Sequence, residues 1–149
     1  MNKAKSSKQK AKQQLALYLQ HPRGELNFLG LKIDAFPKSM FETKLAAHFP
    51  TIKSLLCDYN LFKTVPSEIQ QFTALTTLNF GNNCLTEFPA ANFAKLPLKS
   101  LDISNNPFKN NIIRPITNFA DLTELNIRFF FLSCNFSLKK VGQKFFLNL

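Results

Sequence analysis

Apolar residues recur along the middle of the chain at a spacing that fits neither a helix nor a strand. In LTTLNFGNNCLTEFP, residues 75–89, successive apolar positions are three, two, five and three residues apart. A helix would repeat near every 3.6 residues and a strand near every second residue. Similar stretches stand 23 residues earlier (IKSLLCDYNLFKTVP) and 23 residues later (LKSLDISNNPFKN). This internal repetition predicts a stack of similar structural units.

Aligning the copies by position puts one kind of residue in each column. The columns contain Ile52, Leu75 and Leu98 at the first position, Leu55, Leu78 and Leu101 at the fourth, Cys57, Phe80 and Ile103 at the sixth, and Asn60, Asn83 and Asn106 at the ninth. A further copy starts at Leu122 and an earlier one begins near Glu25, with Phe130 and Leu31 where Asn is expected.

The frame LxxLxLxxNxLxxLP with a 23-residue period resembles the leucine-rich repeat family. The resemblance covers roughly Glu25 to Leu132, and PSEIQQFTAL is similar to the short cytosolic repeats of Ras-suppressor proteins. It implies an α/β fold. We expect a leucine-rich repeat solenoid, a right-handed horseshoe with a parallel concave sheet of about five short strands and an N-terminal capping helix.

The spacing also has a direct physical interpretation. In Leu78-Asn79-Phe80 the first and third side chains of a short strand face the core and the middle one faces out. The Pro-marked return along the convex side adds core residues, for example Ile69 and Phe72, then Phe93 and Leu96, then Ile116 and Phe119. The Asn side chains both donate and accept, so they are expected to form a structural ladder that joins neighbouring turns.

The two ends of the chain differ from the repeats. Residues 1–12 are interpreted as a basic flexible arm, a possible polyanion-binding element with Lys3, Lys5, Lys8, Lys10 and Lys12 and no acid. Residues 13–132 are interpreted as the repeat domain with a helical cap over residues 13–21. Residues 133–149 are a degenerate repeat or a tail, whose apolar residues allow self-association. Deletion of residues 1–12 is expected to leave the fold unchanged.

The composition of the chain limits the cellular compartments in which we expect it to act. No secretory signal and no membrane-length apolar span is recognisable, and the number of cysteines, three, is odd. These features favour a reducing, cytoplasmic location. Leucine-rich repeats also occur in effector proteins that intracellular bacteria deliver to host cells, so the resemblance admits such a role.

Catalytic chemistry is not predicted. The two histidines lack metal or triad spacing, no phosphate-binding glycine motif occurs, and no cofactor or metal is expected. Asp58 and Asp102 belong to different columns of non-adjacent repeats, so they are not expected to form a carboxylate pair.

The predicted function is therefore protein–protein recognition by the outward positions of the strands, called here the concave face. The candidate partner-binding residues are Asp58, Tyr59, Asn79, Asn82, Asp102, Asn105, Asn126, Arg128 and Phe129. Two alternatives are nucleic-acid or anionic-membrane binding through the basic arm, and substrate recognition within a ubiquitin ligase. The identity of the protein partner does not follow from the sequence.

Overall fold

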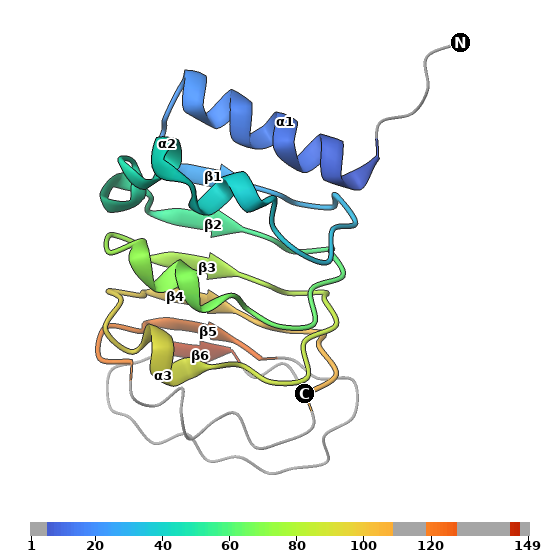
Figure 1. Ribbon diagram of the computed structural model, residues 1–149. Helices are drawn as coiled ribbons and strands as arrows, with labels where there is room; N and C mark the ends of the chain where they lie inside the picture. Colours follow the sequence, from blue (N-terminus) through green and yellow to red (C-terminus); the bar gives the residue numbers. More distant parts are fainter. Residues whose placement is uncertain (1–5, 109–118, 128–143, 147–149) are drawn as a thin grey trace.

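One parallel sheet organises the molecule. The computed structural model describes residues 6–108, 119–127 and 144–146. Figure 1 shows short strands stacked one above another, in the order β1 to β6. The strands are β1 (Glu25–Asn27), β2 (Ser54–Leu56), β3 (Thr77–Asn79), β4 (Ser100–Asp102), β5 (Glu124–Asn126) and β6 (Lys144–Phe146). The five expected strands are present, and β6 adds a sixth within the segment that the sequence assigned to a degenerate repeat or a tail.

The register of the sheet follows the sequence repeat. Leu26 pairs with Leu55, which pairs with Leu78, and the row continues through Leu101 to Leu125. Each of these leucines is buried, while the residues on either side of it in the strand are exposed or half-buried. The alternation expected of a strand therefore directs one face of the sheet to the core and leaves the other face open.

Short helical segments return the chain along the core side of the sheet (Figure 1). These segments are η1 (Lys38–Phe41), α2 (Thr43–Ala46), η2 (Phe49–Thr51), η3 (Ser67–Gln71) and α3 (Ala90–Phe93). Their buried residues include Met40, Ile69 and Phe93. Phe72, Leu96 and Phe119 are buried as expected, whereas Ile116 lies outside the described residues.

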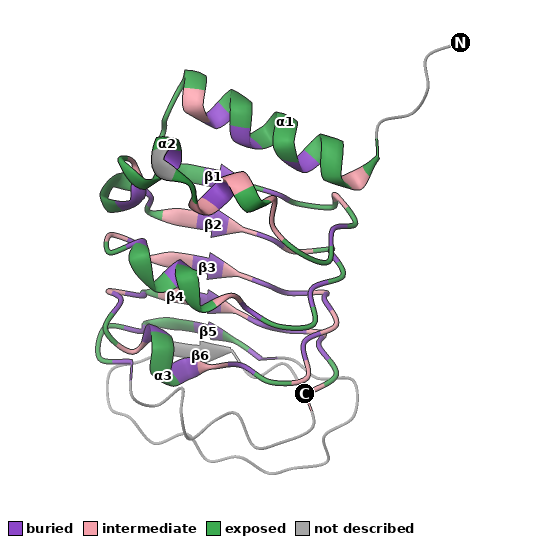
Figure 2. Ribbon diagram, viewed as in Figure 1, coloured by how far each residue is buried: buried purple, intermediate pink, exposed green. Residues whose placement is uncertain are grey.

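The core between the sheet and these returns is rich in phenylalanine. Phe62 packs against Phe36 and Phe80, with ring centroids 4.7 and 5.2 Å apart. Figure 2 shows the buried positions recurring at the middle of the strands from β1 to β5, one above another. No single repeat could enclose such side chains, so each repeat completes the core of its neighbour.

The three asparagines of the ninth column join adjacent repeats. The Oδ1 atoms of Asn60, Asn83 and Asn106 accept hydrogen bonds from the backbone N–H groups of Ile33, Phe62 and Leu85, at 3.1, 3.0 and 2.9 Å. Their Nδ2 groups donate to backbone carbonyls of their own turn and of the preceding repeat. These bonds satisfy buried peptide groups that the turns leave unpaired.

A long helix, α1 (Ser7–Gln20), covers the first repeat and contacts β1 (Figure 1). It starts six residues before the predicted position, Gln13, so the predicted boundary of the flexible arm is wrong. The reason is a capping box: the Ser6 hydroxyl accepts from the Gln9 N–H at 3.3 Å, and the Gln9 side chain accepts from the Ser6 N–H at 2.8 Å. Ala11, Leu15 and Tyr18 form its buried face.

Candidate partner-binding face of the sheet

The concave face carries most of the candidate residues. Asn79, Asp102 and Asn126 are the last residues of β3, β4 and β5, on the side away from the buried leucines. Asp58 stands two residues beyond the end of β2 and is half-buried. Arg128 and Phe129 lie outside the described residues, so their positions on this face stay predictions.

The turn that follows each strand has a left-handed backbone at one fixed position. The φ angles there are 66° at Gly30, 56° at Tyr59, 53° at Asn82 and 52° at Asn105. Glycine and asparagine tolerate this conformation, whereas a bulky aromatic residue seldom adopts it. Among these four described positions, Tyr59 is therefore the one whose side chain is a poor match for its backbone.

Tyr59 is also the most exposed large hydrophobic residue of the described chain, with 61% of its surface accessible. The others are Leu17, Leu29 and Leu61, each 48 or 49% exposed. Leu29 follows β1, and Tyr59 and Leu61 follow β2, where Leu56 is half-buried. We call Leu29, Leu56, Tyr59 and Leu61 the apolar corner. The sequence interpretation included only Tyr59 in the site, although Leu29 and Leu56 occupy outward columns that are polar in other repeats.

The adjoining part of the face is polar and internally bonded. Asp102 Oδ1 accepts from the Ser104 N–H at 2.9 Å and from the Ser104 hydroxyl at 2.7 Å. Asp102 Oδ2 accepts from Asn126 Nδ2 at 2.8 Å, and Asn105 Nδ2 donates to Asn82 Oδ1 at 3.1 Å. Because these bonds fix the side chains before any partner arrives, less rotamer freedom is lost on binding.

Asp58 and Asp102 interact more than their columns suggested. The pKa of the Asp58 carboxyl is raised, chiefly by burial and further by the negative charge of Asp102, while a backbone hydrogen bond opposes the shift. Gly81 is the residue of β3's turn that lies between their repeats. A Cβ added there would meet Asp102 Oδ1 at 3.0 Å and Ser104 Oγ at 3.2 Å. The space beside Gly81, which is buried, is therefore already filled by the Asp102 and Ser104 side chains, and a side chain at this position would displace them.

The raised pKa of Asp58 predicts a pH-dependent cost to folding. When the pKa is higher in the folded than in the unfolded chain, the folded state binds more protons between the two values. The free energy of unfolding should then fall as pH rises from near the ordinary value of 3.8 through the raised one. Asp58→Asn should remove this component, so the wild type should lose stability relative to the variant over that window. Urea titrations of both proteins across the window measure the difference, and parallel curves would contradict the shift.

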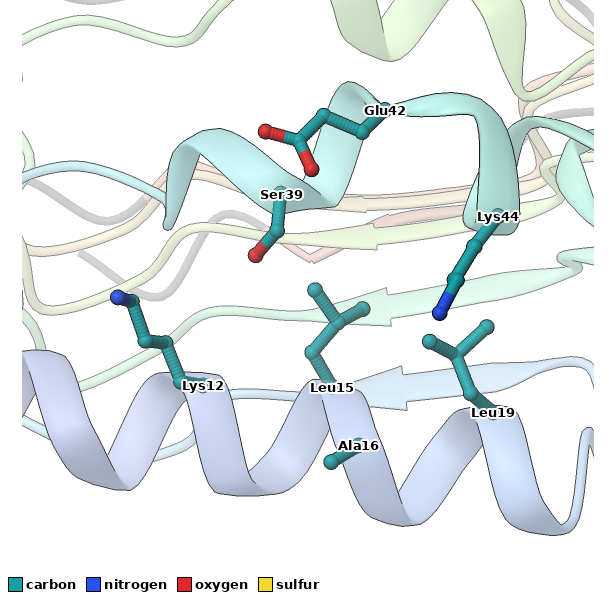
Figure 3. Close-up of a pocket in the computed structure, with 7 residues that line it drawn as sticks. All are labelled: Lys12, Leu15, Ala16, Leu19, Ser39, Glu42 and Lys44. Atoms are coloured by element: carbon teal, nitrogen blue, oxygen red, sulfur yellow. The ribbon is translucent and has the colours of Figure 1, made fainter.

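A groove of about 410 Å³ lies between α1 and the segment η1–α2, away from the sheet. Figure 3 shows Leu15, Ala16 and Leu19 of α1 along one side, with Ser39 and Glu42 opposite and Lys12 and Lys44 near the two ends. The groove combines two cations with one carboxylate, and these charged groups do not point toward a common position. It is therefore not the principal candidate site.

Within the described residues, no group of three or more His, Cys, Asp or Glu side chains is arranged to hold a metal ion. None of the helices in that part of the chain combines the length and hydropathy that a membrane span needs. The described cysteines, Cys57 and Cys84, are free thiols, and burial, followed by the nearby Asp58 charge, raises the pKa of Cys57 well above its ordinary range.

Comparisons with known proteins agree with this architecture. The Leucine Rich Repeat family profile matches residues 74–96 and 97–119, the copies that contain β3 and β4. Among solved structures, the chain is similar to a leucine-rich repeat protein of Leptospira interrogans, with a TM-score of 0.58 and 19% identity, covering 76% of this chain and 34% of that one. The present chain thus spans about a third of that protein's length, and the likeness concerns the fold. A search of curated proteins found no match.

Proposed function

Because this chain is a leucine-rich repeat protein, we propose that it is an interaction module whose concave face binds a partner protein. Solenoids of this kind present extended faces that suit protein ligands. The proposed contact residues are those of the apolar corner together with Asp58, Asn79, Asn82, Asp102, Asn105 and Asn126, and, beyond the described residues, Arg128 and Phe129.

The main support for the proposal is the combination of a left-handed backbone and an exposed side chain at Tyr59. Its left-handed backbone costs folding free energy, on the order of 1–3 kcal/mol for a residue in such a region. Its side chain, which is 61% exposed, recovers little of that cost by burial within the chain. A contact outside the chain explains both features, since tyrosine is among the residues that most often dominate protein interfaces.

Tyr59→Asn is the sharpest test, because asparagine occupies the same position with the same φ in the next two repeats. We expect the variant to fold as well as the wild type or better, and to bind a partner about tenfold or more weakly, as loss of an interface anchor does. Titration calorimetry with a partner isolated on the wild-type chain measures this. The control is Gln70→Ala in η3, which is exposed on the other side of the sheet. A larger loss of affinity in the control would refute the concave assignment.

We further propose a cytoplasmic site of action, for which the free thiols Cys57 and Cys84 are support. The family resemblance extends this proposal to a host protein as the partner of a bacterial effector. Capture from a host cytosol, repeated with Tyr59→Asn as bait, tests both points: a partner retained by the wild type alone supports them, and equal capture by both baits opposes them.

A second candidate function, binding of polyanions, is favoured by the exposed lysines Lys8, Lys10 and Lys12 of α1. The further arm lysines, Lys3 and Lys5, lie outside the described residues. The triple variant Lys8→Gln, Lys10→Gln, Lys12→Gln should keep the fold and reduce binding to RNA or to phosphatidylserine vesicles, with a shallower salt dependence because fewer counterions are released. Unchanged binding and an unchanged salt slope would rule out this candidate.

A further inference from the structure

The groove between α1 and the segment η1–α2 has walls of unbalanced charge. The α1 helix contains three lysines and no acid, and residues 38–46 contain two lysines and one acid, Glu42. Lys12 and Lys44 lie near the two ends of the groove (Figure 3). Neither of these side chains forms an ion pair or a hydrogen bond with another described residue. Both ammonium groups are therefore available to a ligand.

The bottom of the groove is apolar, and the chain does not fill it. Leu15 is buried, Leu19 is half-buried and Ala16 is exposed, and all three line the groove from α1. Opposite them, the Ser39 hydroxyl points into the space between η1 and α1 (Figure 3) and has no hydrogen-bond partner among the described residues. The open volume, about 410 Å³, lies within the roughly 300–1,000 Å³ of ligand-binding sites. The groove therefore has room for apolar side chains of a ligand.

The two cations are separated along the groove rather than gathered at one point. The Lys44 ammonium lies at the end where Leu19 lines the groove, and Lys12 precedes Leu19 by seven residues on α1 (Figure 3). At a rise of 1.5 Å per residue, these two ends are roughly 10 Å apart along the helix axis. One phosphate or carboxylate is too small to contact both ends. The spacing instead suits an elongated ligand with an anionic group at each end and apolar groups between them.

A helix meets these requirements better than an extended peptide does. The walls of the groove are the helical segments α1, η1 and α2, which offer no strand edge to an extended ligand. An extended ligand would leave its peptide groups unpaired against the apolar floor, whereas a helix satisfies most of its own. Helix positions seven residues apart are also roughly 10 Å apart on one face, and the third and fourth positions after the first lie on that same face.

We infer that this groove docks a short amphipathic helix of a partner protein, with two acidic residues seven positions apart and apolar residues three and four positions after the first acid. The acids pair with Lys12 and Lys44, and the apolar residues pack on Leu15, Ala16 and Leu19. Charge complementarity selects this ligand over the α1 helix of a second copy, which is itself basic. The groove is separate from the concave face, so the inference does not rest on the proposed function.

Fluorescence anisotropy with labelled helical peptides and the full chain tests this inference. The probe peptide has two glutamates and two leucines at the inferred positions, on a background of alanine and glutamine. We expect saturable binding that weakens about tenfold or more when both leucines become alanine, because their buried apolar surface is lost. Replacing either glutamate by glutamine should weaken binding about two- to fivefold, as for an exposed ion pair. A scrambled peptide of the same composition should bind about tenfold more weakly or less.

Matched variants of the chain distinguish the groove from general charge attraction. Lys12→Gln and Lys44→Gln should each weaken peptide binding about two- to fivefold. Lys10→Gln is the control, because this exposed lysine projects from the opposite side of α1 and should leave the affinity unchanged. Glu42→Gln removes the acid that lines the groove, so it should strengthen binding by a similar factor. Ala16→Gln places a longer side chain at an exposed helical position and should obstruct the groove without unfolding α1.

The contrary outcomes are equally specific. Equal weakening by Lys10→Gln and Lys12→Gln, or equal binding of the scrambled peptide, would overturn the inference and identify a general attraction of polyanions to α1. Binding that falls with Tyr59→Asn but not with Ala16→Gln would assign the peptide to the concave face, which overturns the inference and leaves the proposed function standing. Phosphatidylserine vesicles whose binding falls with Ala16→Gln would identify a lipid surface as the occupant instead. Absence of binding by every peptide would also overturn the inference.

Discussion

Asn83→Ala should lower the free energy of unfolding by about 1–3 kcal/mol, the cost of leaving a buried polar group without a partner. Asn83 Oδ1 accepts from the Phe62 N–H at 3.0 Å, and this N–H has no other acceptor among the described residues. The carbonyls that Asn83 contacts keep other donors: Cys57 is also bonded by Asn60, and Phe80 by Asn106. The loss should therefore be concentrated on one orphaned donor rather than spread over four broken bonds.

Urea unfolding of the variant measures this loss, with Asn82→Gly as the matched control. Asn82 is the neighbouring residue on the chain, but it lies on the concave side with a φ of 53°, which glycine adopts without strain. Alanine would be a poor control there because it would strain the left-handed backbone. The control also removes the hydrogen bond that Asn82 Oδ1 accepts from Asn105 Nδ2, so we expect it to change stability by about 1 kcal/mol or less. Equal midpoints and equal slopes for the two variants would mean that the ninth column is not the structural one.

The sequence predicted the repeat register well, because a fixed period constrains many positions at once. Once Leu55, Leu78 and Leu101 were aligned, the strands, their buried faces and the ladder of asparagines followed from the alternation of side chains. The end of the chain past Leu132 carried no such constraint, since Asn and Pro are lost there. The pairing of β6 with β5 could therefore not be derived from periodicity.

Features that depend on backbone angles or on distances across the sheet were missed for a different reason. The left-handed angle at Tyr59 is set by the turn geometry, and its column reads Gly, Tyr, Asn and Asn. The glycine and asparagines were the available signal, since both residue types favour this conformation. The contribution of Asp102 to the raised pKa of Asp58 depends on distances across the sheet, which the repeat spacing alone does not give.

The start of α1 was predicted too late because the lysine-rich composition of residues 1–12 was given more weight than the helix-capping residues within it. Five lysines within residues 1–12 suggested a solvated arm, yet Ser6 and Gln9 have the spacing of a capping box. The lysines at positions 8, 10 and 12 are exposed, while Ala11 between them is buried. Small apolar residues on a largely polar helix give a weak periodic signal, so the start of α1 could be recognised only from its cap.

Deletion of residues 1–12 should consequently destabilise the protein, contrary to the expectation from sequence. The remaining part of α1, residues 13–20, would be shorter than the roughly 12–15 residues that a helix needs to persist without strong packing. Leu15 and Tyr18, now 3% and 6% exposed, would return to water at about 1.5–3 kcal/mol for a large apolar side chain. The expected loss is roughly 3–6 kcal/mol for the two, and the buried residues of the first repeat would be uncovered as well.

Thermal and urea unfolding should be measured for the truncated chain and for a full chain that carries Lys8→Gln, Lys10→Gln and Lys12→Gln. The comparison distinguishes the stability contributed by the packing of α1 from any contribution of its lysine charges. The triple variant keeps the capping box and every buried residue of α1, so its stability should stay within about 0.5 kcal/mol of the wild type per exposed substitution. The truncation alone should lower the midpoint. A truncated chain as stable as the wild type would show that the first half of α1 contributes nothing to the solenoid, and the polar arm expected from the sequence would then be the better description of residues 7–12.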